Sequence, residues 1–321
     1  MIFIRCIAQV MCLPGILFKP LEYTERMAIN YDTLINWTFE DVPHQYTERD
    51  TILYALGLGL GRDPLNKDEL HYTYEKGLVA LPTLAVTLST LGMWVKHPDT
   101  GINVVKLVHS GQGATFHKPL PVAASVIGRA RVRDVYDRGA GKGAILVLER
   151  SIYDAKSNEC YCTLEQTLML RGDGGFGGEP PPASSTLAIP DRSADLTGQW
   201  QTSPGQAILY RLSGDLNPLH IDPDVASKAG FSQPILHGFC SYGIAGWIAT
   251  QVSDRPASDL LQLDCRFTAP VIPGERIDFQ FWQQDSQTLL FKALVGDRIV
   301  LTNGLAKLKQ STKSQSYRTA L

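Results

Sequence analysis

Residues 208–222 read ILYRLSGDLNPLHID, and the first five of them, Ile208–Leu212, nearly repeat Ile52–Leu56 in the first half of the chain. A second pair of short stretches, residues 116–119 (FHKP) and 267–270 (FTAP), follows in the same order and at nearly the same separation. Two matches in one order predict a single structural unit that the chain uses twice.

Both halves are expected to contain the same kinds of element. A helical stretch is predicted at Thr83–Trp94 in the first half and at Phe239–Val252 in the second. Runs rich in Val, Ile, Phe and Thr predict strands after each helix. A helix packed against a curved antiparallel sheet buries the apolar stripe of the helix and one face of the sheet, which predicts an α+β fold. The predicted strands are Ala123–Val135, Ala144–Tyr153, Tyr161–Leu170, Leu261–Phe267, Arg276–Gln283, Thr288–Val295 and Ile299–Lys307.

The length of 321 residues is typical of two domains, and the composition places a boundary between them. Glycine-rich residues followed by a run of prolines predict a linker at 172–190. We therefore expect an extension at 1–26, a first domain at 27–171, a second domain at 191–310 and a tail at 311–321.

Charge and cysteine usage exclude several classes of partner and environment. A formal net charge of −2 gives no basic surface for nucleic acid or for an anionic membrane. The apolar stretch near the N-terminus is short for a membrane span and is interrupted by Gln9 and Pro14. The six cysteines show no Cys-x-x-Cys spacing, so free thiols in a reducing, cytoplasmic setting are expected.

The chemistry is concentrated in Asp215, Asn217 and His220, which lie within six positions around Pro218. Proline restricts the backbone, and a bend there can aim the acid and the imidazole at one water molecule, as general acid and base catalysis requires. The alternative is structural: Asp215 as a turn residue and His220 as an ordinary buried histidine. A calcium loop needs a glycine and a terminal glutamate that this stretch lacks, so no metal is predicted.

The first half has no such group of polar residues. At the position of the catalytic stretch it has Leu58 to Asn66, without a histidine. One active site per chain is therefore expected, with the first half free to shape a channel for substrate.

At these residues the chain resembles the MaoC-like, R-specific 2-enoyl-CoA hydratase family, also called hydratase 2, which includes the hydratase portion of peroxisomal multifunctional protein type 2. The resemblance runs from about Met27 to Lys309 and is carried by YRLSGDLNPLH at 210–220, AGF at 229–231 and PILHG at 234–238. It implies a double hot dog fold, in which two helix-wrapped sheets join as a pseudo-dimer. It also implies a hydro-lyase that converts trans-2-enoyl-CoA reversibly to (3R)-3-hydroxyacyl-CoA without metal or redox cofactor.

The resemblance also implies the roles of individual residues. Asp215 and His220 would be the catalytic pair, Asn217 would help to position them, and the backbone N–H of Gly238 would bind the thioester oxygen. Substrate contacts would be made by Phe267, which we expect to open a strand, and by the first-half residues His109, Ser110 and Arg138.

Some positions depart from the family or keep a second interpretation. Family members often have glycine at position 110 and lysine at 138, whereas this chain has Ser110 and Arg138. His109 is equally explained as a structural histidine, Arg138 as a solvated charge at a turn and Phe267 as a core residue. His237 is expected either to bond its own backbone and hold Gly238, or only to sit at a helix start. The peroxisomal address of eukaryotic relatives is absent from the C-terminus, which again predicts a cytoplasmic protein.

Hydration fits these residue types. Negative charge grows on the thioester oxygen during the reaction, and an N–H at a helix start stabilises it. A neutral His220 can take a proton from water, and Asp215, desolvated beside acyl carbons, can deliver one to C2. We expect medium, long or bulky acyl chains and a homodimer. The alternatives are a hot dog thioesterase, which would release CoA, and an acyl-CoA-binding subunit without turnover.

Overall fold

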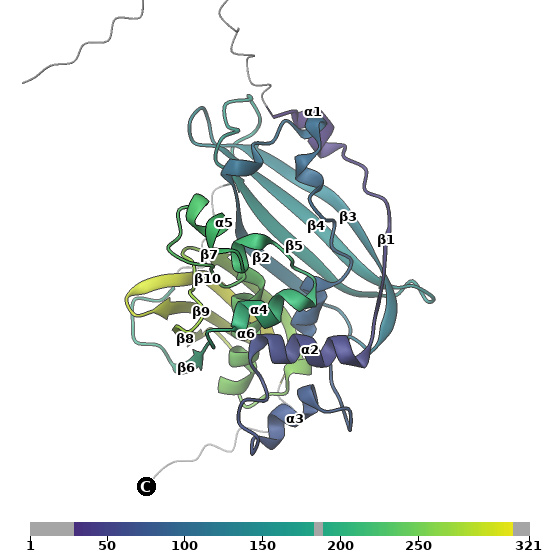
Figure 1. Ribbon diagram of the computed structural model, residues 1–321, viewed down its shortest axis with the longest axis vertical. Helices are drawn as coiled ribbons and strands as arrows, with labels where there is room; N and C mark the ends of the chain where they lie inside the picture. The colour runs from purple at the N-terminus through teal and green to yellow at the C-terminus, as the bar shows by residue number, and fades with distance from the viewer. Residues whose placement is uncertain (1–28, 183–188, 311–321) are drawn as a thin grey trace, which may run out of the picture.

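The structure, a computed structural model, describes residues 29–182 and 189–310 and contains one sheet of ten antiparallel strands (Figure 1). The strand order is β1-β3-β4-β5-β2-β7-β10-β9-β8-β6. From the central β2–β7 pair outward, the first half has the order β2-β5-β4-β3-β1 and the second has β7-β10-β9-β8-β6. The two orders are the same, so the predicted duplication is present in the topology.

The strands comprise five from each half of the chain. They are β1 (Val42–Tyr46), β2 (Leu107–Phe116), β3 (Ala124–Asp137), β4 (Ala144–Asp154), β5 (Cys160–Leu170), β6 (Leu196–Gln201), β7 (Leu260–Phe267), β8 (Arg276–Gln283), β9 (Thr288–Val295) and β10 (Arg298–Leu308). The α-helices are α1 (Tyr31–Ile35), α2 (Glu48–Leu58), α3 (Lys67–Thr73), α4 (Gln206–Tyr210), α5 (Pro223–Lys228) and α6 (Gly238–Val252). Short 3-10 helices are η1 (Pro82–Thr87), η2 (Trp94–Lys96), η3 (Pro98–Thr100), η4 (Val104–Lys106), η5 (Arg211–Ser213), η6 (Pro218–His220) and η7 (Ala257–Asp259).

All seven predicted strands are found within two residues of their expected ends, but three further strands were not predicted. In β2, Gly111 and Gly113 interrupt the apolar alternation that marks a strand. Strand β1 is short and contains Pro43, and β6 is only half buried. These strands are fixed by their partners in the sheet and not by their own pattern.

The second-half helix α6 begins and ends close to where the sequence predicted it. Residues from Cys240 to Thr250 are all buried, because sheet strands lie on one side of α6 and helices of the first half on another. A side chain at Gly243 would collide with Tyr54 and Leu58 of α2. The glycine therefore lets the two halves pack closely around α6, and the largest cluster of buried apolar side chains takes residues from both.

The predicted first-half helix at Thr83–Trp94 is wrong. The segment starts as the 3-10 helix η1 and ends at Thr87, after which Ser89 takes a left-handed conformation with φ of 48°. Arg150 on β4 donates hydrogen bonds to the carbonyl oxygens of Val86 (2.9 Å) and Ser89 (3.2 Å), which are groups that a continuing helix would need for its own bonds. Tertiary contacts thus override the helical pattern.

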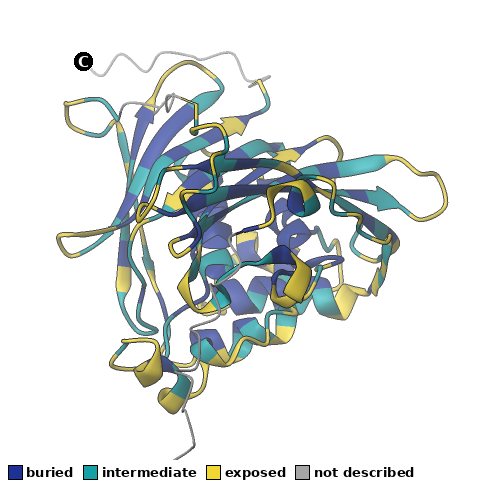
Figure 2. Ribbon diagram, turned by 90° about the horizontal axis from the view of Figure 1, so that it is seen from above, coloured by how far each residue is buried: buried dark blue, intermediate teal, exposed yellow. Residues whose placement is uncertain are grey.

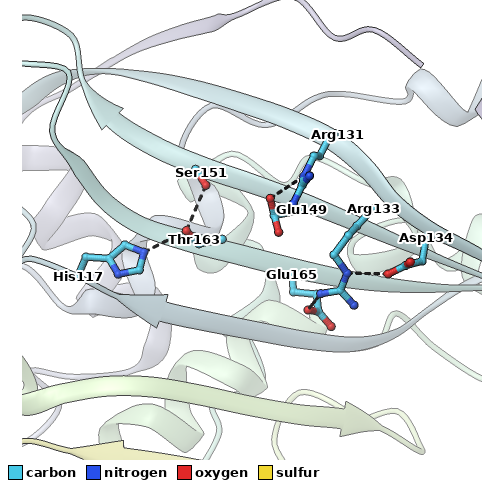
Figure 3. A network of polar contacts seen from close by, with 8 residues as sticks. All are labelled: His117, Arg131, Arg133, Asp134, Glu149, Ser151, Thr163 and Glu165. Atoms are coloured by element: carbon cyan, nitrogen blue, oxygen red, sulfur yellow. Dashed lines mark hydrogen bonds and ion pairs between the residues drawn. The ribbon is translucent and has the colours of Figure 1, made fainter. Parts of the chain in front are cut away.

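The face of the sheet turned away from the core carries charged and polar side chains in the first half (Figure 3). Thr163 and Glu165 alternate with the buried Cys162 and Leu164 along β5, which places them on this outer face. Thr163 Oγ1 lies 3.0 Å from Nε2 of the exposed His117. Neighbouring ion pairs join Arg131 to Glu149 and Arg133 to Asp134 and Glu165. Figure 2 shows the complementary pattern, with buried residues concentrated where the helices meet the sheet.

The described part of the predicted linker, residues 172–182 and 189–190, contains no helix or strand. Its glycines have a definite task, because Gly175 and Gly177 each donate a backbone N–H to the Asp137 carboxylate at 2.7 Å. Burial acts to raise the pKa of Asp137, but these N–H donors outweigh it and the pKa is lowered. The predicted extension at 1–26 and tail at 311–321 lie outside the described residues, and the domain boundaries remain a prediction.

Candidate active site

The loop after α4 is shaped by three local devices that its sequence encodes. Gly214 takes φ of 117°, a conformation that favours glycine, and so turns the chain at the end of η5. The Asp215 carboxylate accepts the backbone N–H of Asn217 at 3.2 Å. The Asn217 side chain in turn accepts the N–H of Leu219 at 3.1 Å and caps η6, whose first residue is Pro218. Asn217 therefore shapes the loop that joins Asp215 to His220.

His220 is buried and held in one tautomer. Its Nδ1 lies 2.8 Å from the backbone oxygen of Ile235, and since a carbonyl only accepts, Nδ1 must carry the proton. The other nitrogen, Nε2, is then an unprotonated base. Burial lowers the pKa of His220, although the hydrogen bond to Ile235 and the charge of Asp215 act to raise it. The ring is neutral at neutral pH and able to accept a proton.

A second histidine lies against this ring. The His237 and His220 rings stack with centroids 3.8 Å apart, and Nε2 of His237 lies 3.1 Å from the backbone oxygen of Asp215. His237 is also the N-cap of α6 and is fully buried. The predicted position at a helix start is therefore confirmed, whereas the expected bond to its own backbone is wrong, because the side chain contacts the backbone of Asp215. Its contact with the loop that joins Asp215 to His220 brings together residues far apart in the sequence, so no local pattern indicates this contact.

Gly238 is the first residue of α6, as the sequence predicted. N–H groups in the first helical turn have no acceptor within the helix, and the helix dipole adds positive potential there. A side chain at Gly238 would lie 3.4 Å from the ring of Phe267. Glycine therefore keeps the helix start close to that ring and leaves room for an oxygen to approach the amide.

Two of the predicted substrate contacts join this group. The His109 ring of β2 meets the rings of Phe239 and Phe267 edge-on, each at 4.9 Å between centroids. Burial lowers the pKa of His109 to about 4, while the charge of Asp215 acts in the opposite direction. Phe267 ends β7, so the expectation that it opens a strand is wrong. The first half thus contributes His109 to a site whose other members come from the second half.

The other two predicted contacts lie apart from these rings. Ser110 is next to His109, but its hydroxyl donates to the backbone oxygen of Thr167 at 3.1 Å. Arg138 is exposed at the turn after β3, where its guanidinium contacts the backbone oxygen of Lys142 and the sulfur of Met169. A direct contact of Arg138 with substrate stays a prediction.

The same side chains have the composition of a metal site. Asp215, His220 and His237 offer ligand atoms that all lie within 4.8 Å of one another. Stacked imidazoles, however, direct their in-plane lone pairs side by side, whereas a metal needs ligands that converge from different directions. His220 Nδ1 and His237 Nε2 are in addition committed to backbone oxygens. The arrangement therefore suits proton transfer by a carboxyl group and a neutral imidazole better than it suits a metal ion.

Comparison with known proteins identifies the class to which this fold and site belong. Residues 185–301 match the model of the MaoC like domain, and residues 44–172 match that of the MFE-2 hydratase 2 N-terminal domain. Together the two matches follow the two halves of the sheet.

Relatives agree with these matches over most of their length. The chain is 36% identical to enoyl-CoA hydratase 2, peroxisomal, of Arabidopsis thaliana over 81% of this chain and 89% of that protein. It is 31% identical to a MaoC-like dehydratase from Phytophthora capsici, whose crystal structure it matches with a TM-score of 0.77 over 88% of this chain and 100% of that one. The chain belongs to the MaoC-like hydratase 2 family.

A more distant structure supports the fold alone. RV0216 of Mycobacterium tuberculosis, described as a double hotdog fold, matches with a TM-score of 0.50 at 15% identity over 84% of this chain and 95% of that one. The ten-stranded sheet with its repeated order is a double hot dog, as predicted.

Proposed function

We propose that this chain catalyses the reversible addition of water to trans-2-enoyl-CoA, forming (3R)-3-hydroxyacyl-CoA. The single observation that carries the proposal is the convergence of a His220 ring nitrogen and the Asp215 carboxylate within 4.8 Å, beside the start of a long helix. Family membership supports the reaction class, since the related Arabidopsis protein is named as an enoyl-CoA hydratase.

The residues divide the reaction between them. The thioester oxygen lies at the N-terminus of α6, where the N–H of Gly238 stabilises the negative charge that grows on it. Nε2 of His220 takes a proton from water as the water oxygen bonds to C3 and the C2–C3 π bond opens. Asp215 delivers a proton to C2. The proton held by His220 then returns to Asp215 and resets the pair.

The hand of the product follows from the placement of the two groups. Ligand atoms of His220 and Asp215 lie within 4.8 Å of each other, close enough to act from the same side, so we expect both additions on one face of the double bond. Syn addition from a single fixed face gives one stereoisomer. A coupled assay with dehydrogenases selective for the R or S product tests the configuration at C3, and formation of the S product would contradict the (3R) assignment.

We also propose that medium, long or bulky acyl chains are the preferred substrates. The support is that the first half has the six-residue η1 at the position where the second half has the 15-residue helix α6. Comparing kcat/KM across trans-2-enoyl-CoAs of increasing length checks the preference. Activity restricted to the shortest substrates would contradict it.

The test of the reaction itself is a two-channel assay. Hydration removes the absorbance of the conjugated enoyl thioester without freeing a thiol, whereas a thioesterase releases CoA. We expect loss of absorbance with no free thiol. Release of thiol, or tight binding with no turnover at any chain length, would favour the thioesterase or the acyl-CoA-binding subunit.

A cytoplasmic homodimer completes the proposal. No helix within residues 29–182 and 189–310 is long and apolar enough to cross a membrane. Four cysteines in those ranges are free thiols, which supports a reducing environment. Sedimentation equilibrium of the full chain measures the oligomeric state, and a monomer would remove the dimer from the proposal.

A further inference from the structure

We infer that His237 is a positioning residue for the hydration, because it holds the Asp215 backbone, the His220 ring and the start of the helix that presents Gly238 in one arrangement. This inference rests on the proposed function. His237 touches all three elements of the site, although it is not itself expected to exchange a proton with substrate.

The contact with Asp215 fixes the acid. The Asp215 backbone oxygen can only accept, so the 3.1 Å contact requires a proton on Nε2 of His237. This is the only side-chain hydrogen bond described for the Asp215 main chain, and it crosses from the N-cap of α6 to a loop that begins with a left-handed glycine. Without it the carboxylate depends on its own local turn for its position.

The contact with His220 fixes the base and excludes water from it. The two rings lie 3.8 Å apart at 28°, which is a stacked pair with no space for solvent between them. The ring centroids of Tyr210 and His237 lie 5.1 Å apart and their planes make an angle of 50°, so His237 contacts both the Tyr210 and the His220 ring. The charged and titratable groups around His237 are His220, Asp215 and Arg211, which influence its pKa, and Tyr210, whose ring contacts it.

The charge state of His237 suits this role. Burial, with a further contribution from His220, lowers the pKa of His237 to about 4. A neutral His237 can stack on His220 without repelling the proton that His220 gains during the reaction. A charged ring at this place would oppose that step.

The place of His237 in the helix links the pair to the thioester site. The His237 carbonyl accepts the N–H groups of Cys240 and Ser241 at 3.1 and 3.2 Å and so begins α6. Its Nδ1 is buried and makes no hydrogen bond within the described residues. A nitrogen buried without a partner is unfavourable for stability, which is typical of a residue kept for a functional geometry.

Two substitutions separate the two contacts. His237→Phe keeps a ring to stack on His220 but removes the N–H donor to Asp215. We expect kcat for crotonyl-CoA to fall about 10- to 100-fold, because small misplacements of a reacting group have effects of that size, with little change in KM. His237→Gln restores an N–H donor without a ring, and we expect its kcat to lie between that of the Phe variant and the wild type.

The pH profile gives a readout that a purely structural role would not move. His220 acts as a base only when unprotonated, so kcat/KM falls as the pH drops through its pKa. In the wild type and in the Phe variant burial holds that pKa below 6.5. In the Gln variant water reaches the ring, the pKa rises toward 6.5, and the acid limb of the profile moves to higher pH.

The matched control is His117→Gln, which alters a histidine on the outer face of the sheet (Figure 3). It is expected to keep the wild-type kcat and acid limb. NMR titration of the His220 ring in each variant measures the change in its pKa without any turnover. A failure of the inference can therefore be distinguished from a failure of the proposed reaction. Wild-type kcat in the Phe variant, or an unchanged His220 titration in the Gln variant, would overturn the inference.

Discussion

Helix α6 and the segment that begins with η1 occupy corresponding positions in the two halves, and they differ in length and in purpose. Helix α6 runs for 15 residues and buries a continuous stretch of them against both halves. The η1 segment has six residues, all buried, and then leaves the helical path at Ser89. The same duplicated sheet therefore supports a long helix beside the loop from Asp215 to His220, and an interrupted segment where the substrate is expected.

A half-buried cation explains much of this difference. Arg150 has the carbonyl oxygens of Val86 and Ser89 as its hydrogen-bond acceptors, and desolvation lowers its pKa to about 10. A half-buried guanidinium needs acceptors, and the carbonyl oxygens of a helix become available to it where that helix stops. Gly128 completes the arrangement, because a side chain there would lie 2.4 Å from the β-carbon of Ser89.

The largest expected effect tests whether the second half alone carries the catalytic groups. Asp215→Ala and His220→Ala should each lower kcat for crotonyl-CoA by about 10³-fold or more, since each removes a general acid or base. The first-half loop offers a matched control in Asp63, whose carboxylate accepts the N–H two residues ahead (Leu65, 2.9 Å) just as Asp215 does. Asp63→Ala should keep nearly wild-type turnover. Equal losses in the Asp63 and Asp215 variants would mean that Asp215 is only a turn residue.

A second effect tests the start of α6. Gly238→Ala places a methyl group beside the Phe267 ring and over the amide that is expected to bind the thioester oxygen. We expect kcat to fall about 10²-fold, which is the size found when one oxyanion donor is lost. Steady-state kinetics and a thermal melt measure activity and stability together. A variant with full activity would show that the oxygen binds elsewhere.

A third effect tests the interrupted segment of the first half. Gly128→Ala pushes on Ser89 and should destabilise the fold by about 1–3 kcal/mol, as overpacking usually does. If the segment borders the acyl chain, activity on long substrates should fall more than activity on crotonyl-CoA. Gly205→Ala is the control, because nothing lies within 4 Å of its added methyl group and its φ is negative. Equal losses at all chain lengths would separate this segment from substrate binding.

The smallest effect concerns Arg138, whose guanidinium is exposed at a turn. If it contacts a CoA phosphate, Arg138→Gln should raise KM for enoyl-CoA by at most about fivefold, since an exposed charge contributes up to about 1 kcal/mol. The increase should disappear at high salt, and kcat should not change. An unchanged KM at low salt would leave Arg138 as a solvated charge.

Much of the fold follows from local pattern. Runs rich in Val, Ile, Phe and Thr indicated seven strands, and the repeat at Ile52 and Ile208 indicated the duplication. In the candidate site, the stretch from Gly214 to His220 encodes its own turn and caps, and Gly238 marks a helix start. These features involve neighbouring residues, so the sequence displays them directly.

What the sequence could not provide are contacts between distant segments. The central place of β2 in the sheet depends on its pairing with β7, and the end of η1 depends on Arg150 from β4. The stack of His237 on His220 and the approach of His109 to Phe267 join residues from separate elements. The sequence by itself determined a duplicated α+β unit and the turn and helix caps around Asp215 and His220, because periodicity and turn chemistry are local. Only the tertiary structure decided which half keeps its helix and which histidine supports the base, because those outcomes depend on packing between residues that are far apart in the chain.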